Sequence, residues 1–130
     1  MILDSSAIVA VLLDESKAAA LLARIEATSV LGVGAPTLAE TGLVLTARLG
    51  LGGATLLTRF VEEADASVVA FTDLHWRAAV HAFARYGKGR HPAALNFGDC
   101  MTYATAHVAN RPLLCLGEDF AQTDLALVTL

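Results

Sequence analysis

Four acidic residues of this chain stand where a predicted strand ends or where the following helix begins. They are Asp4, Glu40, Asp99 and Asp119. Ligands of an open parallel sheet bind outside the carboxyl ends of its strands, so we expect these four side chains to meet in one small volume. Crowded carboxylates repel one another unless protons or divalent cations neutralise them, and oxygen ligands suit Mg²⁺ or Mn²⁺. The pattern therefore predicts a Mg²⁺ or Mn²⁺ site.

Each acid also has a simpler explanation when it is considered alone. Asp4 is placed to cap a helix over Ser5–Asp14, and this is the better explanation of Asp4 by itself. Glu40 lies in the first turns of its helix, where the helix dipole favours a carboxylate, although its neighbours are apolar or small. Asp99 is placed to cap its own helix, and Asp119 fits a turn. Only the occurrence of all four at successive strand ends favours a shared site.

The alternation of short apolar strands with helical segments predicts a single α/β domain. The predicted strands are Met1–Asp4, Val30–Ala35, Ser67–Phe71, Leu113–Leu116 and Ala126–Leu130. The predicted helices are Ser5–Asp14, Lys17–Ala27, Pro36–Gly50, Ala54–Ala64, Asp73–Tyr86 with Asp73 as its cap, and Gly98–Asn110. Because strands that alternate with helices form parallel sheets, we expect a central parallel sheet of about five strands with helices on both faces.

The net charge of −4 over 130 residues argues against broad electrostatic binding to nucleic acid. Basic residues are nevertheless concentrated in one short segment, which ends in a predicted loop. Within this loop Lys88, Arg90 and His91 are placed to contact a phosphate backbone, with Tyr86 or Phe97 stacking on a base. A loop that is simply solvated is the alternative.

No segment of the chain is predicted to enter a membrane. The longest stretch without a charged residue, Ala27–Ala39, is shorter than the roughly 20 apolar residues of a membrane span. The start of the chain has no basic region, and Asp4 interrupts any signal-like apolar run, so we expect a cytoplasmic protein. The apolar fraction of 55% is high, which favours a surface covered by a partner or by a second copy of the chain.

Four short motifs resemble those of the PIN-domain nucleases in their order and spacing. They are Asp4 to Ala7, Pro36 to Glu40, Leu95 to Cys100 and Gly117 to Phe120. The short length and the segment from Tyr86 to His91 most resemble the VapC ribonuclease toxins of bacterial toxin–antitoxin pairs. The resemblance covers essentially the whole chain and implies a PIN-like domain.

The resemblance also implies roles for individual residues. Asp4, Glu40, Asp99 and Asp119 would be the catalytic, metal-binding acids, and the Ser6 hydroxyl would help to position water or metal. We expect Asp4 and Asp99 to ligate directly, and Glu40 and Asp119 directly or through water. The fourth acidic position varies within the family, and Glu118 and Asp124 are nearby substitutes for Asp119.

The implied activity is the hydrolysis of RNA phosphodiesters by a metal-activated water, which leaves a 5′-phosphate and a 3′-hydroxyl. One or two divalent ions supply what this reaction needs, because they lower the pKa of a bound water and stabilise the attacking and leaving oxygens. The resemblance further implies an antitoxin protein as partner and a homodimer.

Two other functions remain open from the sequence. A Mg²⁺-binding receiver-like signalling domain predicts two adjacent acids after the first strand and a lysine after the last one. Here Ser5 and Ser6 follow Asp4, and no lysine occurs after Lys88. A non-catalytic PIN-like scaffold should lack some of the acids, yet all four are present. The nuclease is therefore the favoured interpretation.

Overall fold

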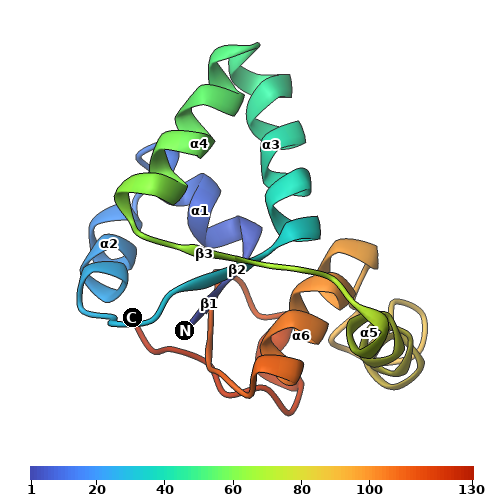
Figure 1. Cartoon of the computed structure of the whole chain (residues 1–130). Coiled ribbons are helices and arrows are strands. Elements are labelled where there is room, and N and C mark those ends of the chain that lie inside the picture. The colour runs from blue at the N-terminus through green and yellow to red at the C-terminus, as the bar shows by residue number, and fades with distance from the viewer.

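A parallel sheet runs through the middle of the molecule, with helices packed on both sides of it (Figure 1). The computed structural model describes residues 1–130. The strands are β1 (Ile2–Leu3), β2 (Gly32–Gly34), β3 (Ser67–Val69) and β4 (Leu113–Leu114), all parallel, in the order β3-β2-β1-β4. The predicted α/β class is thus confirmed.

The sheet has four strands rather than about five. The segment Ala126–Leu130, predicted as the last strand, makes a single parallel bridge between Leu127 and Leu113. Its partner β4 is only two residues long, so no longer ladder of backbone hydrogen bonds can form beside it.

Six helices connect the strands close to the predicted positions. They are α1 (Ser5–Leu12), α2 (Ala18–Glu26), α3 (Ala35–Leu49), α4 (Gly52–Glu63), α5 (Asp73–Tyr86) and α6 (Phe97–Ala109), and a short 3-10 helix η1 covers Phe120–Gln122. Gly50 ends α3 as predicted, with a positive φ of 71° that glycine adopts without a steric penalty. No helix combines the length and apolar character that crossing a bilayer requires.

The connections make β1 the point at which the strand order reverses. Helices α1 and α2 lead from β1 to β2 on one side, whereas α5 and α6 bring the chain from β3 back to β4 on the other. Ligands of open α/β sheets bind at such a switch point, outside the carboxyl ends of the strands. Asp4, directly after β1, stands at this point.

Two apolar cores lie on the two faces of the sheet, and neighbouring residues of a strand belong to different cores. Leu3 and Leu114 pack with α1, α2, α3 and α4. Ile2 and Leu113 pack with α5 and α6. Successive side chains of a strand point to opposite faces, so two-residue strands suffice to divide the domain in this way.

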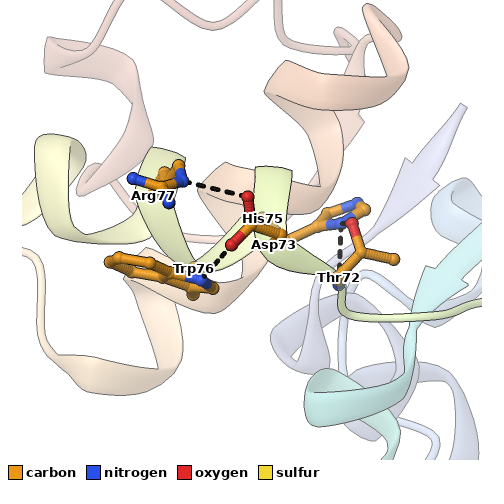
Figure 2. Close-up of polar contacts among 5 residues, drawn as sticks. All are labelled: Thr72, Asp73, His75, Trp76 and Arg77. Atoms are coloured by element: carbon orange, nitrogen blue, oxygen red, sulfur yellow. Dashed lines mark hydrogen bonds and ion pairs between the residues drawn. The ribbon is translucent and has the colours of Figure 1, made fainter.

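The cap of α5 lies one residue before the predicted one (Figure 2). Thr72, not Asp73, is the N-cap, and its backbone N–H donates to Nδ1 of His75 at 3.1 Å. Asp73 is the first helical residue, and its carboxylate accepts from Trp76 Nε1 at 2.9 Å and from Arg77 Nε at 3.0 Å. Trp76 is 47% exposed.

Helices α3 and α4 approach so closely that Gly53 has no room for a side chain. A Cβ there would lie 2.6 Å from the carbonyl carbon and oxygen of Leu45, whereas a Cβ on the adjacent Gly52 would meet nothing within 4 Å.

We expect Gly53→Ala to lower the free energy of unfolding by about 1–3 kcal/mol through overpacking. Gly52→Ala should leave it unchanged or raise it slightly. Urea denaturation measures both, and equal effects would contradict the close approach.

Candidate active site

Asp4 is a buried carboxylate that serves as the N-cap of α1. It is 5% exposed, and its Oδ2 accepts from the backbone N–H of Ser6 at 3.1 Å and from Ser6 Oγ at 2.5 Å. Its Oδ1 accepts from Thr102 Oγ1 at 3.0 Å. The capping explanation of Asp4 is therefore confirmed, and the same carboxylate stands at the carboxyl edge of the sheet.

Ser6 connects the ends of β1 and β4. Its hydroxyl donates its only proton to Asp4 and accepts from the backbone N–H of Leu116 at 3.0 Å. In this arrangement Ser6 orients the Asp4 carboxylate. Its predicted contact with water or metal stays a prediction.

Asp99 lies in the first turn of α6 and shares a capping box with Asn96. The backbone N–H of Asp99 donates to Asn96 Oδ1 at 2.9 Å, and the backbone N–H of Asn96 donates to Asp99 Oδ2 at 3.0 Å. Asn96 is thus the N-cap, a position that the sequence had suggested for Asp99. One carboxylate oxygen of Asp99 has no hydrogen-bond partner in the protein.

The pKa of Asp99 shows that the acids share one electrostatic environment. Burial raises this pKa to about 6, the backbone N–H of Asn96 opposes the rise, and the negative charges of Asp4, Asp119 and Glu40 add to it. The charges of the other three predicted acids therefore all reach Asp99.

Glu40 reaches across from α3 to the start of α6. A Cβ on Gly98 would overlap Oε2 of Glu40, so this carboxylate lies directly against the backbone one residue before Asp99. Gly98 is half-buried. Glycine is the only residue type without a Cβ, so it alone leaves this space open for the Glu40 carboxylate. The sequence analysis had not assigned Gly98 this role.

Asp119 and its suggested substitute Asp124 lie in different surroundings. The charge of Asp119 is among those that raise the pKa of Asp99. Asp124 instead accepts from Tyr103 Oη at 2.7 Å and pairs with Arg85 at 3.6 Å, and these contacts keep its pKa below the ordinary value.

No basic side chain neutralises the four acids. The ion pairs of the chain lie elsewhere and join Arg59 to Glu63, Arg77 to Asp73 and Arg85 to Asp124. The acids also form no closed cage, since no three acidic, histidine or cysteine side chains converge closely enough to enclose an ion. An open set of oxygen donors still fits Mg²⁺, which keeps several waters and needs only one or two carboxylates.

The predicted RNA-binding loop is held by its own backbone. Lys88 N donates to Leu95 O at 3.0 Å, and His91 N donates to Gly87 O at 3.1 Å. The side chains of Lys88 and Arg90 are exposed, whereas His91 is partly buried and its Nδ1 accepts from the backbone of Ala93 at 3.1 Å.

The two aromatic residues proposed to stack on a base differ in exposure. Tyr86 is 4% exposed and packs against His91 and Tyr103, so the expectation that it stacks on a base is wrong. Phe97 is 80% exposed and lies two residues before Asp99, where its ring is open to solvent.

Two threonines that contact the site were missed in the sequence. Thr102 donates to Asp4, and Thr37 contacts Thr102 at 3.1 Å between the two Oγ1 atoms. The available signal was their spacing, because each is three residues from an acid on its own helix, Glu40 on α3 or Asp99 on α6. Residues three apart on a helix share a face.

The crowding of acids predicts a pH-dependent effect of Asp99→Asn in metal-free buffer. The unfolded chain ionises this carboxyl near the ordinary value of 3.8, whereas the folded protein holds the proton to about pH 6. The folded state thus binds more protons between these values, so ionisation of Asp99 lowers the free energy of unfolding as pH rises. We expect the variant to gain stability over wild type between about pH 4 and pH 7.5.

Urea denaturation at both pH values measures this gain, with EDTA present throughout. Glu118→Gln is the control, because Glu118 is an exposed neighbouring acid that does not act on Asp99. A stability difference for Asp99→Asn that stayed constant with pH would contradict the raised pKa.

Comparisons with known proteins show what this chain is similar to. A PIN domain model matches residues 1–125 of the chain. Ribonuclease VapC36 of Mycobacterium tuberculosis is 52% identical over 126 residues, which cover 96% of this chain and 91% of that protein. Ribonuclease VapC30 of Mycobacterium tuberculosis is 42% identical over 130 residues, which cover 100% and 99%.

Solved structures show the same fold at lower identity. The VapC20 toxin of Mycobacterium tuberculosis, described as cleaving the sarcin-ricin loop, has a TM-score of 0.81 at 17% identity, covering 99% of this chain and 98% of that one. A toxin–antitoxin complex from Klebsiella pneumoniae has a TM-score of 0.73 at 17% identity, covering 98% and 95%. The family match and the sequence relatives together show that this chain belongs to the PIN-domain family and, within it, to the VapC ribonucleases.

Proposed function

We propose that this protein is a Mg²⁺- or Mn²⁺-dependent endoribonuclease that acts as the toxin of a toxin–antitoxin pair. The observation that carries the proposal is the set of four carboxylates at the switch point of the sheet, which no lysine or arginine neutralises. Relatives that match nearly the whole chain are named ribonucleases, which supports RNA as the substrate.

Asp4 and Asp99 would hold the cation directly, with Glu40 and Asp119 bound directly or through water. The cation supplies a water of lowered pKa and neutralises charge on the phosphate. The protein contributes the placement of the carboxylates: Ser6 fixes the orientation of Asp4, and the Asn96 N–H leaves one oxygen of Asp99 unoccupied. Products with a 5′-phosphate and a 3′-hydroxyl complete this part of the proposal.

The RNA would approach over the start of α6. Phe97 offers an exposed ring two residues before Asp99. Any of the four bases can stack on such a ring, so this contact does not depend on the RNA sequence. The exposed cations Lys88 and Arg90 are suited to the phosphate backbone, and His91 belongs to the same loop.

Protein partners are the second part of the proposal. The toxin–antitoxin complex from Klebsiella pneumoniae shares the fold, and it supports an antitoxin that binds this chain. Exposed apolar side chains also support a homodimer, because monomeric soluble proteins rarely leave large apolar patches uncovered. Three of them, Trp76, Val80 and Phe83, lie on α5 and line a groove of about 580 Å³.

The other two functions have less support. Membership of the PIN-domain family argues against a receiver-like signalling domain. A non-catalytic scaffold would have no reason to keep four unneutralised acids together, since their repulsion destabilises the fold. Measurement of RNA cleavage separates the scaffold from the nuclease.

The decisive experiment is the cleavage of total cellular RNA by purified protein, with Mg²⁺ or Mn²⁺ compared with EDTA. We expect discrete fragments only in the presence of metal. Asp4→Asn should reduce the rate at least about a hundredfold, because the loss of a ligand should exceed the 10–100-fold cost of losing a ligand's hydrogen-bond partner. Asparagine keeps an oxygen that can accept the N–H of Ser6, so the cap of α1 should survive.

Circular dichroism of both proteins is the control for folding. If the folded wild-type protein, free of any bound antitoxin, cleaves no RNA, the non-catalytic scaffold becomes the favoured function. Full metal-dependent activity in Asp4→Asn would remove Asp4 from the site.

The contact between Glu40 and Gly98 gives a second prediction. A methyl group at Gly98 would occupy the position of Glu40 Oε2, and because this atom ends a flexible side chain, the carboxylate should move while the fold is kept. We expect Gly98→Ala to unfold at the same or a higher temperature than wild type, since alanine favours helix over glycine. Its cleavage rate should fall about tenfold or more.

Gly42→Ala is the matched control for this prediction. It adds the same methyl group to α3, two residues after Glu40, where the nearest atom is Leu57 Cδ2 at an ordinary 3.6 Å. Equal activities of the two variants would show that the position of Glu40 does not matter for cleavage.

A further inference from the structure

Two chains of hydrogen bonds end on the Asp4 carboxylate, one on each oxygen. Ser6 provides both bonds to Oδ2, and Thr102 provides the bond to Oδ1 at 3.0 Å. Thr102 in turn contacts Thr37, with 3.1 Å between the two Oγ1 atoms. Thr37 and Thr102 are 2% and 1% exposed, so water does not compete for their hydroxyl groups.

The direction of these bonds follows from the number of protons. An ionised carboxylate only accepts, and a threonine hydroxyl has one proton to donate. Because Thr102 donates its proton to Asp4, Thr37 must be the donor to Thr102. The two hydroxyls thus form a directed chain from α3 through α6 to the end of β1, and such chains strengthen their members cooperatively.

These hydrogen bonds also determine which oxygen of Asp4 keeps a free lone-pair site for a cation. A carboxylate oxygen has about two lone-pair sites. Both sites of Oδ2 are occupied by Ser6, whereas Oδ1 accepts only one bond, from Thr102. One site on Oδ1 therefore stays open, next to the Thr102 hydroxyl.

The threonine contact also lies one helical turn from two of the acids. Thr37 precedes Glu40 by three residues on α3, and Thr102 follows Asp99 by three residues on α6. Residues three apart lie on the same face of a helix, so the contact joins the two faces that carry the acids.

Other buried threonines do not behave in this way. Thr105, 1% exposed on the same helix, donates to the carbonyl of Met101, four residues earlier. Thr41 likewise donates to the carbonyl of Thr37. These are the usual bonds of threonine within a helix. Only Thr37 and Thr102 link two helices and a catalytic carboxylate through their hydroxyls.

We propose that Thr37 and Thr102 are positioning residues of the metal site. Together they hold the Asp4 carboxylate with one site of Oδ1 open to the cation, and they fix the separation of Glu40 and Asp99. This inference rests on the proposed function, because a cation bound by these acids is part of it.

The test is the affinity for Mn²⁺ without RNA, measured from the electron paramagnetic resonance signal of free Mn²⁺. We expect Thr102→Val, which keeps the shape and removes the hydroxyl, to weaken binding about 10–100-fold. Thr102→Ser restores the hydroxyl and should bind close to wild type. Thr105→Val is the control, since it makes the same substitution at an equally buried position of α6 and should leave the affinity unchanged.

Thr37→Val gives an independent measurement. Thr102 can still donate to Asp4 in this variant, so the loss should be smaller than in Thr102→Val. In the double variant the fold-loss of Mn²⁺ affinity should be smaller than the product of the two single fold-losses, because both substitutions break the same chain of hydrogen bonds. Thermal unfolding of every variant identifies those that are folded.

The outcomes separate this inference from the proposed function. Wild-type affinity in folded Thr102→Val would overturn the positioning role alone. If Thr102→Val does not fold, Thr37→Val decides: weaker binding supports the role and unchanged binding overturns it. A wild-type protein that binds no Mn²⁺ would overturn the proposed metal site, and this inference with it.

Discussion

The repulsion among four carboxylates at one edge of the sheet is the constraint on which the site depends. Its consequence is visible at Asp99, whose pKa rises to about 6 through burial and through the charges of the other acids. A cation at this edge would replace that repulsion with attraction, so the protein gains more from binding it than one with a neutral pocket would. The same crowding that weakens the metal-free fold would thus favour the metal-bound fold that we propose.

Uncharged donors hold the acids in place against this repulsion. Ser6 and Thr102 donate to Asp4, and the backbone N–H of Asn96 donates to Asp99. A lysine or arginine in their place would neutralise the site, but it would also occupy the position that a cation needs. Hydroxyl and amide donors orient the carboxylates and leave the charge of the pocket negative.

The sequence could place the acids near strand ends and helix starts because the elements that carry them leave local signals. The apolar run of β1 ends at Asp4, and Gly50 ends the helix that carries Glu40. Contacts between distant residues left no comparable signal: Thr37 and Thr102 are 65 residues apart.

Errors in the predicted elements have similar physical reasons. The segment Ala126–Leu130 has the composition of a strand, but its partner β4 offers only two residues to pair with. Tyr86 ends α5 and precedes an exposed loop, yet it is buried because α5 packs against α6 there. In α6 the capping box of Asn96 and Asp99 sets the start of the helix, and the backbone N–H of Asn96 fixes one oxygen of Asp99. Asp99 therefore resembles Asp4, which caps α1: each of these acids takes part in the cap of a helix and also belongs to the candidate site.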